Sequence, residues 1–586
     1  MSKWDLTNFY PNDEAWNKDF NTLKSMLPKY KNYQGKLHLY DSFLDYHKFD
    51  KEVTELLYKV YPYASLSSDL NLKDQDKMVR KQQLQLVLSN LSQLTSFVSP
   101  EIISVGEKKV LDFLNKDPFL KDFIFPYQKL FRGEIHILDA EKEALLANYN
   151  PIRGIPSSLY QALSIIDRTD EEITLSDNSK VVVSQANFSA LIKEAKTKED
   201  RELIFSTLYK KYRENSNAFA STYNLVLQQL EANVKSRKYE DALDSALFKN
   251  NIPTSVFHNL LEVAYENTDL IKRYIKIRKK ALNLDKYHTY DRFLSISNNK
   301  TKYPYHEAKK LFLDSLKGLP NEFILKQEDA IKDGFVDVLP KDGKRTGAYS
   351  SGVYGHHPYI LLNHNETLDS VFTLAHEAGH SAHTLFSNEN QPMPISNYTI
   401  FVAEIASTFN EHILLDHLLK VAKTKDEKIA LLESAIDGIL ATFFRQTLFA
   451  NYEYEANKLV KEGKPITENS LSQIMINLYK HYYDLDINEE PGKKYVWAYI
   501  PHLFYTPFYV YQYATSFSAS LKIYDNVKNN IPKAFDNYLG LLKSGGSKFP
   551  VDQAKLAGAD LTNKETFMAV IKRLKYLIDL LEKELD

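Results

Sequence analysis

Cysteine is absent from this chain of 586 residues. Its absence excludes disulfides, cysteine-type zinc sites, cysteine-ligated iron–sulfur clusters and thiol nucleophiles. The sequence also lacks an apolar stretch after Met1, where a secretory signal would need one. Both absences fit a cytoplasmic protein, and we expect that location.

Neither charge is in excess, because 74 Lys and Arg residues stand against 76 Asp and Glu residues, for a formal net charge of −2. No stripe of Lys or Arg stands out, so we expect no nucleic-acid partner. Hydrophobic residues make up 44% and charged residues 26%, a balance typical of folded, soluble proteins. The chain is long enough for several large cores.

One stretch is long and uncharged enough to resemble a membrane span. No Asp, Glu, Lys or Arg occurs between Lys494 and Lys522. The stretch contains two prolines, His502 and many tyrosines, and Thr and Ser dilute its apolar character. These features favour a buried segment around a cavity, and we expect no membrane association.

Most of the sequence predicts helix, with apolar residues spaced by three and four among charged ones. Long stretches of this kind without an internal proline include 194–237, 256–282, 425–462 and 563–585.

Strand signals are few. Residues 173–183 predict a hairpin, in which β-branched arms flank an Asp-Asn-Ser turn. A glycine-rich zone at 334–365 holds a strand-like segment, Tyr359–Asn363. The fold class is therefore mainly α with a small β component. We place the best single domain boundary after the hairpin, which gives domains 1–190 and 191–586.

A His-Glu-Ala-Gly-His motif follows the glycine-rich zone. On a helix, His376 and His380 lie one turn apart, so both imidazoles can reach one metal ion. Glu377 lies beside that face, where it can take a proton from metal-bound water. The alternative is a helix that carries two histidines by coincidence, so a third ligand has to be identified.

Glu404 is the best candidate for the third ligand. The long metzincin motif would need a histidine at position 386 and a glycine at 383, but these positions hold Phe386 and His383. Glu404 instead lies in a mostly apolar helical stretch, where an unpaired carboxylate is costly and a metal would supply the missing partner.

Three further side chains lie near these ligands. Glu411 and Asp369 are each two turns from a ligand, and either can accept the outward N–H of a ligand histidine. The alternative for both is a capping or surface carboxylate. His383 as a fourth ligand would close the position that a catalytic water needs, so we interpret it as a core or supporting histidine.

The chain resembles the oligoendopeptidase F group of the thimet oligopeptidase-like metallopeptidases. The resemblance runs from the first residues to beyond residue 500. Its motifs, besides His376–His380, are Trp4–Thr7, Ser236–Leu243, Gly343–Gly352, Pro358–Asn363, Phe401–Glu404 and Tyr499–His502.

The resemblance implies a mainly helical fold with two lobes around a deep substrate channel and a small β-sheet near the active site. Such enzymes hold one zinc ion and cut internal bonds of short peptides, and their third ligand matches Glu404. A His and several Tyr of a C-terminal segment approach the substrate, here matched by His502 and Tyr509. The spacing from that His to the tyrosines is shorter here than in the thimet-type branch.

The expected protein is therefore a zinc-dependent oligoendopeptidase with Glu377 as general base and with His502 and Tyr509 as oxyanion donors. The segment Tyr359–Asn363 is expected to pair with an extended peptide through main-chain hydrogen bonds. The alternatives are a carboxypeptidase or dipeptidyl carboxypeptidase with the same site, and an inactive peptide-binding protein. Two His and one carboxylate also suit Mn, Co or Fe.

Overall fold

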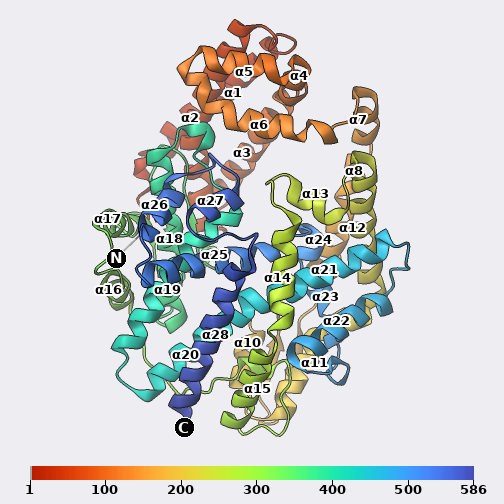
Figure 1. Cartoon of the computed structure of the whole chain (residues 1–586), viewed down its shortest axis with the longest axis vertical. Helices are drawn as coiled ribbons and strands as arrows, with labels where there is room; N and C mark the ends of the chain where they lie inside the picture. Colours follow the sequence, from red (N-terminus) through yellow and green to blue (C-terminus); the bar gives the residue numbers. More distant parts are fainter. Residues whose placement is uncertain (1–2) are drawn as a thin grey trace. The chain divides into compact units, whose positions relative to one another are not determined.

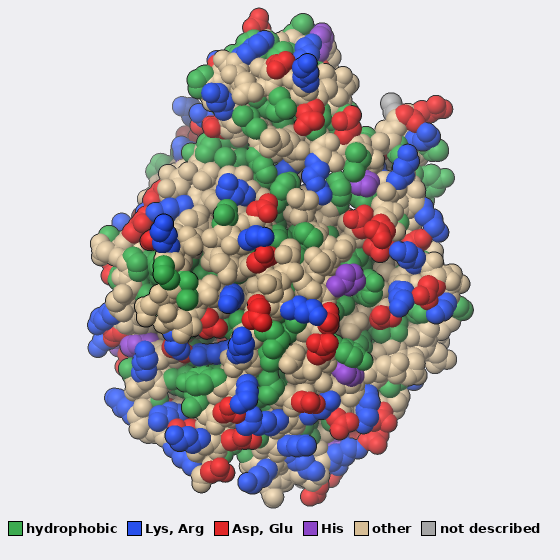
Figure 2. All heavy atoms as spheres, in the orientation of Figure 1, with side chains coloured by type: hydrophobic (Ala, Val, Ile, Leu, Met, Phe, Trp, Pro, Cys, Tyr) green, Lys and Arg blue, Asp and Glu red, His purple; other side chains and the backbone are tan. Residues whose placement is uncertain are grey.

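A computed structural model describes residues 3–586 of the chain (Figure 1). Helices make up most of the described chain, and strands form only two small sheets. The mainly α fold class is confirmed. On the face drawn in Figure 2, Lys and Arg side chains are interspersed with Asp and Glu, as the balanced charge leads one to expect.

The chain folds into two compact units, each assembled from three segments. The first unit contains the described part of Met1–Ile135 together with Thr301–Leu418 and Asn526–Gly558; the second contains His136–Lys300, Leu419–Asp525 and Ala559–Asp586. The expected boundary near residue 190 falls inside the second unit and stays a prediction. The expected channel between two lobes also stays a prediction.

Helices of the first unit come from all three of its segments. They are α1 (Asp13–Met26), α2 (Tyr40–Leu70), α3 (Gln75–Leu94), α4 (Val98–Val105), α5 (Glu107–Lys116), α6 (Ile124–Arg132), α16 (Tyr305–Ser315), α17 (Asn321–Ala330), α18 (Leu368–Asn390), α19 (Ile400–Val421), α26 (Ala534–Lys543) and α27 (Pro550–Leu556).

Helices of the second unit include several short ones and two π-helical turns, Ala162–Ile166 after α9 and Leu440–Phe444 between α20 and α21. They are α7 (Ala140–Ala147), α8 (Asn150–Arg153), α9 (Ile155–Gln161), α10 (Phe188–Glu194), α11 (Lys198–Glu214), α12 (Ser216–Arg237), α13 (Ala242–Phe248), α14 (Thr254–Glu266), α15 (Asp269–Ala281), α20 (Lys425–Ile439), α21 (Arg445–Lys461), α22 (Glu468–Tyr483), α23 (Val496–Tyr499), α24 (His502–Tyr505), α25 (Tyr511–Lys528) and α28 (Lys564–Leu585).

Two of the predicted long helices are interrupted at an asparagine. Asn215 separates α11 from α12, and Asn267 ends α14 before α15 begins. Each amide side chain donates to a backbone carbonyl of the preceding turn, at 3.1 Å for Asn215 and 2.8 Å for Asn267. Asparagine competes in this way with the helical hydrogen bonds, and helices often break where it does so.

The predicted hairpin is confirmed as β1 (Glu171–Thr174) and β2 (Lys180–Val183), an antiparallel pair in which Glu171 faces Val183. The other sheet contains β3 (Val336–Asp337), β4 (Tyr349–Ser351) and β5 (Tyr359–Leu361) in the order β3-β5-β4. It lies in the first unit, and β5 leads into α18.

The expectation that Tyr359–Asn363 pairs with a peptide is wrong. Strand β5 is the middle strand, parallel to β3 on one side and antiparallel to β4 on the other. Its main-chain groups are therefore already bonded within the sheet, and its three residues are buried. Among the described strands of this sheet, β3 and β4 are the edges.

The uncharged stretch after Lys494 forms α23, α24 and the first part of α25 rather than one long helix. Several of its large side chains are buried, including Trp497 and Phe504, whereas Tyr505 is exposed. Within residues 3–586, no helix combines the length and apolar character that a bilayer crossing requires.

Candidate metal centre

Helix α18 carries both histidines of the motif, and it begins at a defined cap. Thr367 precedes the helix, and its side chain accepts a hydrogen bond from the backbone N–H of Ser370 at 3.3 Å. Such a cap satisfies one of the free N–H groups at a helix start. His376 and His380 follow one turn apart on this helix, as the motif predicts.

Gly379 lets α18 approach α19 closely. A Cβ at this position would lie 2.6 Å from the carbonyl oxygen of Ala406 and 2.7 Å from the Cα of Ser407. Only glycine fits without displacing the α19 backbone. This contact between the two helices determines how near Glu404, on α19, lies to the two histidines.

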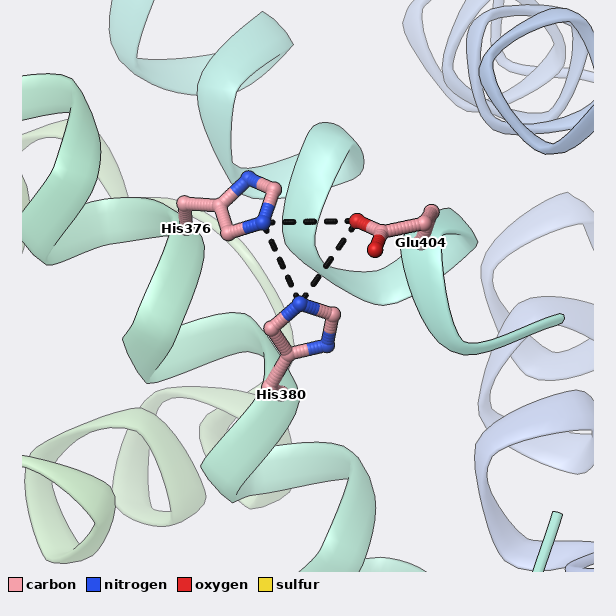
Figure 3. Close-up of side chains that lie close together, drawn as sticks. All are labelled: His376, His380 and Glu404. Carbon is pink, nitrogen blue, oxygen red and sulfur yellow. Dashed lines mark hydrogen bonds and ion pairs between the residues drawn. The ribbon is translucent and has the colours of Figure 1, made fainter. Parts of the chain in front are cut away.

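The two histidines and Glu404 converge on one point (Figure 3). The Nε2 atoms of His376 and His380 are 3.1 Å apart. The Oε2 atom of Glu404 lies 3.3 Å from the first and 3.5 Å from the second. A tetrahedral ion with bonds of about 2.0–2.1 Å holds its ligand atoms roughly 3.3 Å apart, so the three spacings fit zinc.

The hydrogen bonding of His376 also fits a metal site. Its Nδ1 lies 2.6 Å from Oε1 of Glu411, a carboxylate that can only accept a hydrogen bond when ionised. A neutral His376 that donates there carries a lone pair on Nε2, directed at His380 and Glu404. A metal ion, or a proton on His376 when no metal is bound, offsets the repulsion among these three electron-rich atoms.

The charges of these groups are strongly coupled. Burial disfavours the charged form of His376, but the hydrogen bonds and charges of Glu404 and Glu411 outweigh it and raise the pKa of His376 well above its usual value. Burial lowers the pKa of His380 to about 4. Burial opposes ionisation of Glu404 as well, yet the two histidines hold its pKa at about 2. The site thus presents a carboxylate beside an imidazole that stays neutral.

Glu377 lies next to this group and is only 6% exposed. Burial raises the pKa of its carboxyl to about 7, although the charge of His376 and the backbone N–H of Ser350 act in the opposite direction. Among the described residues, nothing hydrogen-bonds its Oε2 atom. A buried carboxylate with an unbonded oxygen is well suited to accept a proton.

Of the two carboxylates expected to support a ligand histidine, the structure selects Glu411. Asp369 is exposed near the start of α18, and within the described residues its carboxylate makes no hydrogen bond. The alternative interpretation of Asp369, a surface carboxylate, is therefore confirmed.

His383 is a core residue, as expected. It is completely buried and stacks on Tyr398, with ring centroids 3.6 Å apart and planes within 7° of each other. Burial lowers its pKa to about 3, so it stays neutral. It does not belong to the group of possible metal ligands.

No role for Tyr398 or Ser407 was predicted from the sequence. The Tyr398 hydroxyl lies 3.4 Å from the backbone oxygen of His380, and Ser407 Oγ donates to Oε2 of Glu404 at 3.0 Å. Ser407 lies three residues after Glu404, on the same face of α19, and this spacing was the available signal. Tyr398 precedes α19, and no periodic pattern marks it.

His502 and Tyr509 belong to the second unit, whereas the metal ligands belong to the first. Their rings are stacked on each other, with centroids 5.7 Å apart and planes within 13°. Tyr513 contacts both rings. The structure thus brings the two predicted residues together, and their role toward the oxyanion stays a prediction.

Two known protein families match parts of the chain. The family described as Peptidase family M3 matches residues 191–573, and the one described as Oligopeptidase F matches residues 101–169. The predicted domain boundary near residue 190 falls between these two matches.

Relatives match along nearly the whole chain. Oligopeptidase PepF of Bacillus subtilis is 33% identical over 99% of this chain and 87% of its own length. An oligoendopeptidase F homolog of Borreliella burgdorferi is 35% identical over 99% of this chain and 98% of its own. A crystal structure from Chlamydophila abortus is 33% identical, with a TM-score of 0.89 over 99% of this chain and 98% of that one. The chain therefore belongs to peptidase family M3, in its oligoendopeptidase F group.

Proposed function

We propose that this protein is a zinc-dependent oligoendopeptidase that hydrolyses internal bonds of short peptides. As a member of peptidase family M3, the chain is a peptidase of the metallo-oligopeptidase kind. The observation that carries the finer proposal is the convergence of His376, His380 and Glu404 beside the unbonded carboxylate of Glu377.

His376, His380 and Glu404 are the residues that would hold the metal ion. Bound there, zinc supplies a Lewis acid that polarises the scissile carbonyl and lowers the pKa of a water molecule. Three protein ligands leave one position open, which favours a catalytic over a structural site. Two His and one carboxylate also suit Mn, Co or Fe, so metal content has to be measured.

Proton transfer is the role of Glu377. Its carboxylate accepts a proton from the attacking water and passes it to the leaving amine. Glu411 keeps the Nδ1 of His376 protonated and its ring oriented, which leaves Nε2 free to bind the metal. His502 and Tyr509 donate hydrogen bonds to the oxyanion of the tetrahedral intermediate.

The proposed substrate class, short peptides, follows from the names of the relatives, which are oligopeptidase and oligoendopeptidase. In the chain itself, β4 is an edge strand of the sheet that precedes α18. An extended peptide that adds to this edge would be held by main-chain hydrogen bonds, which tolerate many sequences. A cytoplasmic location remains part of the proposal.

The test is cleavage of a quenched fluorescent peptide of about eight to ten residues, blocked at both ends. We expect wild type to cut internal bonds, Glu377→Gln to keep its zinc but lose roughly 100-fold or more in kcat, and Glu404→Ala to lose its zinc. Wild type that binds zinc but cuts nothing would favour an inactive peptide-binding protein. A Glu404→Ala protein that keeps both zinc and activity would eliminate Glu404 as a ligand.

The same assay separates the endopeptidase from its closest alternative. A carboxypeptidase or dipeptidyl carboxypeptidase needs a free C-terminal carboxylate, so blocking that end would abolish cleavage. Mapping the products by mass spectrometry then shows whether the cuts are internal.

A further inference from the structure

A cavity of about 280 Å³ lies within the second unit, among α15, α22 and the π-helical turn Leu440–Phe444. Its walls are mostly apolar or aromatic, with Ile271, Ile275, Phe293, Leu440 and Tyr483 among them. The charged side chains among its lining residues are those of Arg292, Arg445 and Asp437. Apolar walls with a few polar groups are typical of sites for small molecules.

Arg292 and Arg445 have no carboxylate partner. Among the described residues, neither guanidinium forms an ion pair or a hydrogen bond, and Nε of Arg445 is buried and unbonded. Arg278, in the same unit, is fully buried and pairs with Glu433 at 2.6 Å. Both arginines are half-buried and their charge has no partner, so they are well suited to receive an anion.

The nearby carboxylates are held by other groups. Oδ1 of Asp437 accepts a hydrogen bond from the Tyr274 hydroxyl at 2.9 Å, and Oδ2 lies 3.7 Å from Arg278. Burial raises the pKa of Asp437 to about 6, although the charge of Arg278 acts in the opposite direction. Both oxygens of Glu490 accept hydrogen bonds from Thr289, one from its backbone N–H and one from its hydroxyl.

A further basic side chain, that of Lys493, lies beside Tyr479, which lines the cavity. Lys493 is buried among aromatic rings, with its Nζ 5.3 Å from the centre of Tyr209 and 5.2 Å from that of Tyr479. Burial lowers its pKa well below the usual value, and the charge of Arg292 adds to the effect. Lys493 therefore adds little positive charge, and the unpaired positive charge at the cavity is that of Arg292 and Arg445.

The π-helical turn Leu440–Phe444 shapes the cavity wall. Leu440, Ala441 and Arg445, which line the cavity, lie on this turn or directly after it. A helix rotates about 100° per residue, so the wider turn changes the direction in which Arg445 leaves the helix. Such turns are rare and occur frequently at functional sites.

We propose that this cavity binds a small organic acid that carries an aromatic or branched aliphatic group. The carboxylate would pair with Arg292 and Arg445, because planar guanidinium groups match carboxylates in two-point hydrogen bonds. The apolar part would lie against walls such as Ile271 and Phe293. A single inorganic ion would leave most of the cavity to water against apolar walls, since one water accounts for only about 30 Å³. This inference does not depend on the proposed peptidase mechanism.

The test is isothermal titration of the full-length, metal-loaded protein with 3-phenylpropionate and, separately, with its amide. We expect the acid to bind at least roughly tenfold more tightly than the uncharged amide. Carboxylates also bind metal ions, so the titration is repeated on Glu404→Ala, where we expect the same affinity. A loss of binding there would place the acid at the metal instead and overturn the proposal.

Variants locate the site within the second unit. Arg445→Gln and Arg292→Gln are expected to weaken binding of the acid roughly tenfold or more, whereas Arg213→Gln, a change at an exposed arginine, leaves it unchanged. Ala441→Leu keeps both arginines but fills the cavity, and it is also expected to weaken binding. Melting temperatures without ligand show that each variant is folded. Equal binding of acid and amide, unchanged affinity in both arginine variants, or displacement of the acid by equimolar chloride would each contradict the proposal.

Discussion

At the scale of single residues, we expect Glu411 to act on the proposed metal centre through its hydrogen bond with His376. Glu411→Gln is expected to weaken zinc binding by roughly 10- to 100-fold, because the ligand loses the group that fixes its tautomer and orientation. Competition with a chromogenic zinc chelator measures this affinity. Asp369→Asn is the matched control, since Asp369 lies in the first turn of α18 but bonds to no histidine. Equal losses in both variants would mean that the effect is general electrostatics.

Tyr509 makes a second test at this scale. If its hydroxyl donates to the oxyanion, Tyr509→Phe is expected to lower kcat roughly 100-fold with little change in zinc content. Tyr505→Phe changes an exposed tyrosine of the same segment and should leave kcat unchanged. Should Tyr509→Phe retain the wild-type kcat, the oxyanion role would be lost and Tyr509 would be only a packing partner of His502.

At the scale of elements, the contact of α18 with α19 positions Glu404, the proposed third ligand. Gly379→Ala places a methyl group 2.6 Å from the Ala406 carbonyl, so the helices have to separate. We expect a loss of about 1–3 kcal/mol in stability together with weaker zinc binding. Thermal unfolding and metal titration measure the two effects.

Gly438→Ala is the control for this prediction. Gly438 lies in α20, and a Cβ there would have no atom within 4 Å. Alanine at an unhindered helical position adds about 0.5–1 kcal/mol, so the two substitutions should act in opposite directions. A Gly379→Ala protein as stable and as zinc-loaded as wild type would contradict the role given to this contact.

The geometry of the metal group follows from local sequence rules to a large extent. His376 and His380 fall on one face because of the helical repeat, and Glu404 is recognisable as a carboxylate in an apolar stretch. The choice of Glu411 over Asp369 was not predictable, because it depends on how α18 crosses α19. Tyr398 was not predictable for the same reason, because it stacks on His383 from outside both helices.

The strands, too, could be predicted from the sequence only in part. The segment at Tyr359 is recognisable as a strand from its composition, yet its central position in the sheet follows from pairing with β3 and β4. Both partners are short and lie in a glycine-rich zone that has no periodic pattern. The helix breaks at Asn215 and Asn267 were missed because apolar spacing continues through them, while the competing side-chain hydrogen bonds are local.

At the scale of the whole molecule, a buried carboxyl makes stability depend on pH. Burial raises the pKa of Glu453 from 4.5 to about 8, although its carboxylate accepts the backbone N–H of Phe508. Between these two pH values the unfolded chain has released the proton and the folded chain has kept it. Stability from this group is therefore present below pH 4.5 and falls as the pH rises toward 8.

Glu453→Gln keeps an acceptor for Phe508 and removes the titration. We expect the melting temperature of this variant to fall less between pH 5 and pH 8 than that of wild type. Glu455→Gln, at a half-exposed neighbour, should follow the wild-type curve. An equally steep fall in Glu453→Gln and wild type would show that other groups carry the pH dependence.

The division of the molecule into units was the least predictable feature. Each unit gathers three segments that are far apart in the sequence, such as Thr301–Leu418 and Asn526–Gly558. Two of the borders fall inside helices, because α19 and α25 each extend across one of them. A linear scan for boundaries finds the hairpin near residue 190 because its composition changes locally, and long-range packing leaves no such local mark.

The most direct test of the central claim is a crystal structure of the zinc-loaded protein, with anomalous diffraction recorded on both sides of the zinc absorption edge. The account predicts one zinc peak per chain, bonded to Nε2 of His376, Nε2 of His380 and a carboxylate oxygen of Glu404, with Glu377 left unbonded to the metal. Zinc held by other residues, or Glu377 in place of Glu404 as the third ligand, would contradict the account.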